Sequence, residues 1–193
     1  MNTSFINLVK ELNTGIDERK KLDEYKEIIA KKVIQNANEA LQDCQSALKL
    51  AEEINHGDYI AYYTHQLGNC YHAISEFDKA QENILKAIDL YSEKHDTNNL
   101  VACNLNLANV YIHKKDYRNG LKYLSESYRL NQIENSSLVK ARLLNNFGVV
   151  YMDTENFKKA LKYFLECIKI SKEIDSPFDL QSCYVNIGMI YKK

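Results

Sequence analysis

The chain has 193 residues, enough for one domain with a continuous core, and its 45% of apolar and 26% of charged residues are typical of a globular protein. A formal net charge of −1 offers no general attraction to nucleic acid or anionic lipid, and no apolar run approaches the roughly 20 residues that span a bilayer. The single proline and six glycines indicate an all-α chain, for which we expect no nucleic-acid and no membrane partner.

The first predicted element is a short N-terminal helix or cap within residues 1–20. Its apolar residues have helical spacing, and Gly15 ends it. The order of basic and apolar residues is not that of a signal peptide. The apolar residues are Phe5, Ile6, Val9 and Leu12.

Residues 21–57 are predicted to form a degenerate copy of a repeat that becomes regular further along the chain. Its second helix keeps the apolar pattern, whereas its first helix has Ile28 and Lys31 where later copies have a small residue and a tyrosine. Such a helix suits the end of a repeat array, because an end needs a polar outer face. The residues that keep the pattern are Ala40, Cys44, Ala47 and Leu50.

From residue 58 onward the chain repeats itself at a spacing of 40 residues. Three full units are predicted at 58–97, 98–137 and 138–177, and residues 178–193 form the first helix of an incomplete unit. The first-helix columns are Leu67, Leu107, Phe147 and Ile187; Gly68, Ala108, Gly148 and Gly188; and Tyr71, Tyr111, Tyr151 and Tyr191. The second-helix columns are Phe77, Tyr117 and Phe157; Ala80, Gly120 and Ala160; Ile84, Leu124 and Phe164; and Ala87, Ser127 and Cys167.

These columns have a packing interpretation. Spacings of three and four residues place each set on one face of a helix. A small residue at position 68 or 80 lets two helices approach closely, and the tyrosine at 71 fills the space beside that contact. Short polar links separate the helices, so each unit is predicted to be an antiparallel helix pair.

The pattern Leu-Gly-x-x-Tyr, followed by Phe-x-x-Ala with a large and a small apolar residue after it, resembles the tetratricopeptide repeat (TPR) family. The resemblance covers residues 58–193 and implies a right-handed α-solenoid of antiparallel helix pairs. The common TPR unit has about 34 residues, and longer units resembling this one occur in kinesin light chain, spindle-orientation adaptors and sensory regions of bacterial signalling proteins. Because the last unit lacks a second helix, we expect a fragment of a longer protein; the alternative is that this helix is itself the cap.

The resemblance implies that first helices line a concave groove that binds a protein or peptide. The column beside the packing face carries carboxamides, which can hold both the C=O and the N–H of an extended peptide. Neighbouring residues on the same face of each first helix are also predicted to line the groove. The predicted groove residues are His65, Gln66, Asn69, Asn106, Asn109, Arg142, Asn146 and Asn186.

A narrower alternative is the carboxylate clamp of some TPR co-chaperones, in which lysine, arginine and asparagine hold a peptide C-terminus. The clamp positions correspond here to five of the groove residues. Two expected cations are replaced by His65 and Asn146, which weakens this interpretation. The positions are His65, Asn69, Asn106, Arg142 and Asn146.

The sequence offers no catalytic or metal-binding pattern. His65 and His72 have no partner at metal-ligand spacing, and the glycines belong to packing columns rather than to a phosphate-binding loop. We therefore expect no enzyme activity, no cofactor and no metal. The five cysteines form no CxxC pair and fit reduced thiols in a cytoplasmic protein.

The function expected is that of a peptide- or protein-binding scaffold, the sensory or adaptor region of a longer signalling protein. One alternative is a peptide-pheromone receptor of a bacterial regulator, although residues 1–55 hold no recognisable helix-turn-helix. Another is a self-association module that forms a homodimer through the C-terminal helix.

Overall fold

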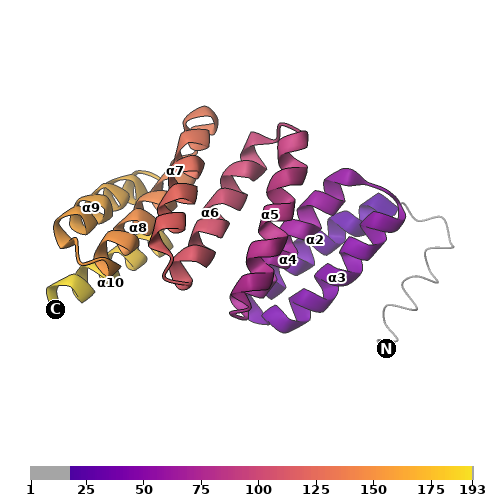
Figure 1. Ribbon diagram of the computed structural model, residues 1–193, viewed down its shortest axis with the longest axis horizontal. Coiled ribbons are helices and arrows are strands. Elements are labelled where there is room, and N and C mark those ends of the chain that lie inside the picture. Colours follow the sequence, from indigo (N-terminus) through magenta and orange to yellow (C-terminus); the bar gives the residue numbers. More distant parts are fainter. Residues whose placement is uncertain (1–17, 193) are drawn as a thin grey trace.

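The computed structural model describes residues 18–192, and this part of the chain is an elongated stack of nine α-helices without strands (Figure 1). The all-α solenoid expected from the repeat is confirmed. The expected N-terminal helix or cap lies outside the described residues, apart from residues 18–20. The helices are α2 (Glu18–Gln35), α3 (Ala37–Glu53), α4 (Gly57–Ala73), α5 (Phe77–Glu93), α6 (Thr97–His113), α7 (Tyr117–Glu134), α8 (Ser137–Asp153), α9 (Phe157–Glu173) and α10 (Pro177–Lys192).

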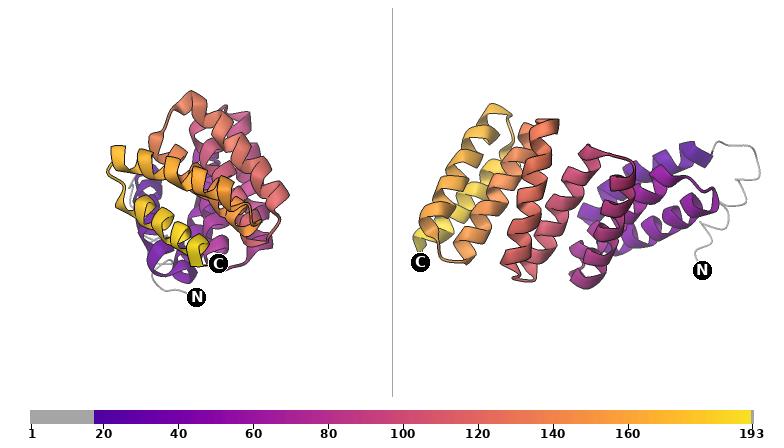
Figure 2. Two further views of the ribbon diagram at one scale, coloured as in Figure 1. Left: turned by 90° about the vertical axis from the view of Figure 1, so that its left-hand side faces the viewer. Right: turned by 45° about the horizontal axis from the view of Figure 1, so that its top comes forward.

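Successive helices pack against each other in chain order along the stack (Figure 2). We call α2, α4, α6, α8 and α10 the first helices and α3, α5, α7 and α9 the second helices. Each first helix also contacts the next first helix, and these are the substantial contacts between alternate helices in residues 18–192. The first helices are therefore crowded together on an inner face, while the second helices spread apart on an outer face.

The links between helices end one helix and start the next in a regular way. In seven links a residue in the left-handed region closes the helix, and in four of these the side chain of the next residue caps the following helix. At Lys115 the φ angle is 60°, its N–H bonds the Ile112 carbonyl, and the Asp116 N–H bonds the Tyr111 carbonyl, both at 2.9 Å. The Asp116 side chain then accepts from the Asn119 N–H at 3.1 Å. The residues with positive φ are Asn55, Ser75, His95, Lys115, Asn135, Glu155 and Asp175.

The small-residue column allows the close helix contact that the sequence predicts. A Cβ atom added at Gly68 would lie 2.5 Å from Cγ1 of Ile84 and 3.2 Å from the backbone nitrogen of that residue. A Cβ at Gly148 would lie 2.5 Å from Cε1 in the ring of Phe164. Real Cβ atoms do not approach other atoms this closely, so glycine is a packing requirement at both positions.

The degenerate first helix, α2, covers the inner side of the first regular unit. Leu22 and Ile29 are fully buried, and the hydroxyl group of Tyr63 on α4 donates a hydrogen bond to the Leu22 carbonyl. Ile28, which replaces the small residue of later copies, is 45% exposed. The position that receives a second helix in other units is thus open to solvent here, which explains why a large residue is tolerated.

Candidate peptide-binding groove

Carboxamide side chains connect neighbouring first helices along the inner face. In each full unit the first helix presents a half-buried asparagine or glutamine at the column of Gln66, one residue before the leucine or phenylalanine column. The asparagines at this column donate hydrogen bonds to the preceding first helix. We call each of these connections a joint; the donors are Asn106, Asn146 and Asn186.

The joint between α4 and α6 contains four of the predicted groove residues. Asn106 Nδ2 donates to Asn69 Oδ1 at 2.8 Å and lies 3.0 Å from His65 Nε2. Asn69 Nδ2 in turn donates to Gln66 Oε1 at 3.3 Å. Because an amide nitrogen can only donate, this geometry fits a neutral imidazole whose Nε2 accepts. The four side chains form one connected polar network.

His65 lies beneath this network rather than on the groove surface. Only 4% of the residue is exposed, and burial lowers its pKa to about 4. Burial lowers the pKa because the charged imidazolium loses its hydration in the interior. The structure therefore gives His65 the role of an acceptor that orients Asn106, since direct contact with a groove ligand would need more exposure.

The joint between α6 and α8 borders a hollow on the inner face. Asn146 Nδ2 donates to Asn109 Oδ1 at 2.5 Å, and both residues line a hollow of about 470 Å³. This bond leaves the Nδ2 donor group of Asn109 and the Oδ1 acceptor of Asn146 for a further partner. Together they offer the donor and the acceptor that one peptide unit requires. The remaining wall residues are Ile112, His113, Lys115, Tyr117, Val149 and Asp153.

The joint between α8 and α10 uses a residue that the sequence analysis missed. Asn186 Nδ2 donates to Asn145 Oδ1 at 3.1 Å, whereas the position equivalent to Asn69 and Asn109 is occupied by Val149, which cannot accept. Asn145 occupies the column of His65. The sequence could have indicated Asn145 through a second polar column, which steps by 40 residues from His65. Leu105 interrupts this column in the middle unit.

The five residues of the clamp alternative do not converge on one point. His65, Asn69 and Asn106 meet at the first joint, while Asn146 belongs to the second. Arg142 is exposed one turn before Asn146 on α8. A clamp needs several cations around one carboxylate, and here the buried, neutral His65 supplies no charge.

A pair of histidines lies on the same inner stripe near the ends of α4 and α6. The ring centroids of His72 and His113 are 4.9 Å apart, and Phe77 stacks on His113 at 5.7 Å. Burial and the neighbouring His113 lower the pKa of His72, and its Nε2 atom is buried without a hydrogen-bond partner. The described side chains hold no group of three or more His, Cys, Asp and Glu residues arranged for a metal ion.

Models of the tetratricopeptide repeat match two stretches, residues 61–94 and residues 100–173. Together these stretches cover more than half of the chain. The chain belongs to the tetratricopeptide repeat family. The matched stretches contain every residue of the first two joints described above, so these joints connect TPR units. No curated protein sequence matches the chain.

Solved structures share this TPR fold at low sequence identity. BtubC (BKLC) from P. vanneervenii is 18% identical with a TM-score of 0.78, and the match covers 98% of this chain and 78% of that one. The apo form of RapI is 16% identical with a TM-score of 0.79, covering 98% and 53% respectively. A signal transduction ATPase from Pyrococcus horikoshii, whose tetratricopeptide repeat is described as a sensor, is 16% identical with a TM-score of 0.78, covering 96% and 29%. At these sequence identities the similarities establish the fold, and the function must be inferred from the site.

Proposed function

We propose that the chain is a scaffold that binds an extended peptide or protein segment along its inner face. The observation that carries the proposal is the second joint, where one asparagine pair borders a hollow of about 470 Å³ and keeps a donor and an acceptor for a peptide unit. Each such hydrogen bond contributes only about 0.5–1.5 kcal/mol. Affinity would therefore come from several joints acting together, with side chains such as Val149 supplying apolar contact.

We further propose that this binding serves a sensory or adaptor role in signalling. The similarity to a TPR sensor in a signal transduction ATPase supports that role. A cytoplasmic setting fits the five free cysteines, all of which are buried, because a reducing compartment preserves thiols. No helix in residues 18–192 has both the length and the apolar composition to cross a membrane.

The test is a peptide-library pulldown with the double variant Asn106→Ala and Asn146→Ala. We expect the wild-type hits to disappear, because two joints lose their side chains at once. Asn83→Ala is the matched control, since this asparagine lies on a second helix and donates only to the Lys79 carbonyl of its own helix. Circular dichroism at the assay temperature must show both variants folded. Unchanged binding by the folded double variant would refute the groove proposal.

Self-association through α10 is the second candidate function. Helix α10 exposes large apolar side chains over a broad surface, with Tyr191 77% exposed and Phe178 72% exposed. Pairing of this surface with a second copy would cover these side chains. Light scattering over a range of concentrations tests this candidate: a mass that rises from monomer to dimer supports it, and a strict monomer at high concentration contradicts it.

A further inference from the structure

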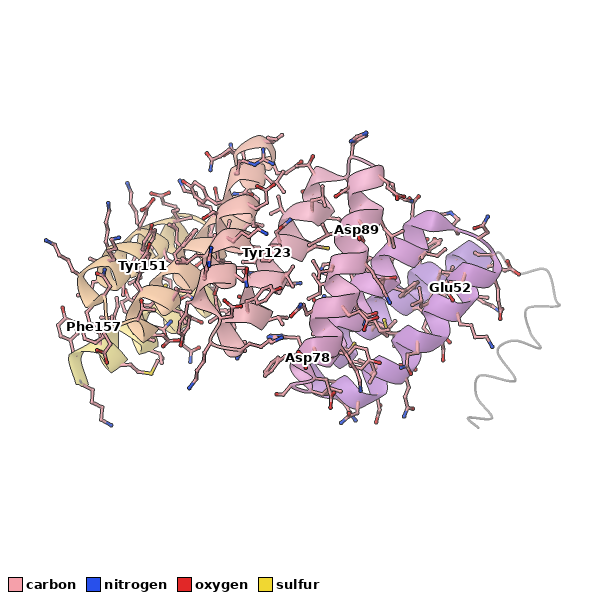
Figure 3. The ribbon with its side chains drawn as sticks, viewed as in Figure 1. Glu52, Asp78, Asp89, Tyr123, Tyr151 and Phe157 are labelled. Atoms are coloured by element: carbon pink, nitrogen blue, oxygen red, sulfur yellow. The ribbon has the colours of Figure 1, made fainter. Side chains whose placement is uncertain are left out.

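The outer face has a charge gradient that the net charge of −1 conceals. The net charge of the second helices changes from negative to positive along the stack. Helix α3 carries four acids and one lysine, a net charge of −3, and α5 carries four acids and two lysines, a net charge of −2. Helix α7 carries three bases and two acids, a net charge of +1, and α9 carries five lysines and two glutamates, a net charge of +3. In Figure 3 the labelled acids Glu52, Asp78 and Asp89 all lie on the α3 and α5 half.

The positive charge of α9 is not neutralised within the described part of the chain. None of its five lysines is in an ion pair there. The two lysines of α5 are both paired, Lys79 with Glu76 at 3.3 Å and Lys86 with Glu82 at 2.7 Å. The lysines of α9 are exposed, so they are available to an anionic partner.

A hollow of about 360 Å³ lies beside these lysines, on the outer face between α7 and α9. Helix α8 supplies its floor with Leu144 and Phe147, and the walls are Tyr128 on α7 and Tyr163 on α9. The Phe147 ring stacks on Tyr163 at 5.3 Å and meets Tyr128 edge-on at 6.5 Å. A hollow of this volume is at the small end of ligand sites and suits one large apolar side chain.

The rim of the hollow combines two positive groups with one negative group. Lys159, Lys162 and Glu166 belong to it, and the Lys159 ammonium lies 4.9 Å from the centre of the Tyr151 ring. The equivalent positions in the preceding unit are Asn119, Lys122 and Glu126, one positive charge fewer. The second positive charge on the rim therefore distinguishes this unit from the preceding one.

We propose that this hollow, defined as the outer-face site, binds an acidic segment of a partner protein that inserts one aromatic or large aliphatic side chain. The aromatic walls bury the inserted side chain, and the α9 lysines attract the flanking carboxylates. The outer-face site is separate from the groove on the inner face, and neither depends on the other.

The experiment uses fluorescence anisotropy with a labelled ten-residue peptide in which one phenylalanine is flanked on both sides by aspartate and glutamate. We expect binding at low salt that weakens as salt rises, because exposed charges are screened beyond about 10 Å at 0.1 M. Lys162→Glu should weaken binding about tenfold, and Glu166→Lys should strengthen it. Both residues are exposed, so the variants keep the fold.

Two controls locate the binding. Lys122→Glu makes the same charge change at the equivalent position of the preceding unit and should have a much smaller effect. A second peptide with glycine in place of phenylalanine should bind much more weakly. Equal loss in both lysine variants, equal binding of both peptides, or no binding at about 1 mM peptide would each overturn the proposal. So would concentration-dependent self-association that Lys162→Glu abolishes, because the acidic occupant would then be a second copy.

Discussion

Helices α4 and α10 carry the same first-helix pattern and have different surroundings. A Cβ atom at Gly68 would collide with Ile84, whereas a Cβ at Gly188 would meet no atom within 4 Å. Tyr71 is half-buried, whereas Tyr191 is 77% exposed. The pattern is the same in both helices, but in the described structure only α4 has a following second helix packed over the glycine, whereas α10 packs against the preceding helices α8 and α9.

The difference shows what the repeat pattern encodes. The helix itself does not need glycine, which lowers helix stability relative to alanine by about 1 kcal/mol. Glycine is needed only where another helix comes close, as at Gly68. The pattern on α10 therefore specifies a packing surface that the described residues leave open. Four predictions test this contrast between α4 and α10.

The largest expected effect is acid destabilisation of the α4–α6 joint. His65 has a pKa of about 4 in the folded chain, against an ordinary value of 6.5, so the unfolded chain takes up the proton first as pH falls. The free energy of unfolding should then decrease by about 3 kcal/mol between pH of about 6.5 and 4, and the loss should end below that window. Chemical denaturation at a series of pH values measures it.

The matched variant for this prediction is His65→Leu, which introduces the residue found at Leu105 in the next unit. The variant should lose most of the decrease in that pH window, and a smaller part should remain because burial also lowers the pKa of His72. Aspartates with lowered pKa values, such as Asp78, lose their contribution to stability only below their ordinary pKa of 3.8, which lies under the window. On α10 the equivalent residue is Val185, so no comparable acid sensitivity arises there. A full decrease in His65→Leu would contradict the prediction.

The second effect concerns close packing in α4. Gly68→Ala should lower the free energy of unfolding by about 2 kcal/mol, because the added Cβ must displace Ile84 and approaches the backbone at 3.2 and 3.3 Å. Thermal unfolding should show a melting temperature lower by about 4–8 °C for a chain of this size. An unchanged melting temperature would mean that α4 and α5 can move apart at low cost.

The third effect compares two joints. Asn106→Ala removes contacts with both His65 and Asn69, so we expect a loss of about 1–2 kcal/mol of stability. Asn186→Ala removes one bond to Asn145 at the open end, for which we expect about 0.5–1 kcal/mol. Denaturant titration of both variants under the same conditions gives the ranking. The reverse ranking would show that the α8–α10 joint is the stronger one.

The smallest effect is a gain. Gly188→Ala should raise the free energy of unfolding by up to about 1 kcal/mol, because alanine favours the helix and the new Cβ lies in open space. The same change at Gly68 has the opposite sign, so the pair of variants isolates the effect of the covering helix. Destabilisation by Gly188→Ala would indicate that this face is already covered in solution.

The sequence predicted most of the fold because packing columns repeat. The close contact at Gly68 and Gly148 and the helix pairs followed from spacing and residue size, and both are confirmed. The carboxamide column was also visible at Asn106 and Asn146, but its hydrogen-bond partners were not. A column in the sequence shows which residues are equivalent, while a joint depends on how far neighbouring helices are rotated and displaced.

Two features could not be predicted from the columns. His65 was placed on the groove stripe, and only the structure shows that Asn106 covers it. The outer-face site depends on the divergence of α7 and α9, which exposes Phe147 between them. Both features depend on how neighbouring helices are placed relative to each other. This placement is set by many contacts at once, and no single residue signals it.

The left-handed turn residues occur every 20 residues from Asn55 to Asp175. An insertion of one residue within a helix rotates every later side chain on it by about 100° and would separate Asn146 from Asn109. The partners across each joint would then face different directions. Changes in chain length that preserve the groove must therefore come as whole helix pairs, so a solenoid of this kind can lengthen or shorten only in discrete steps.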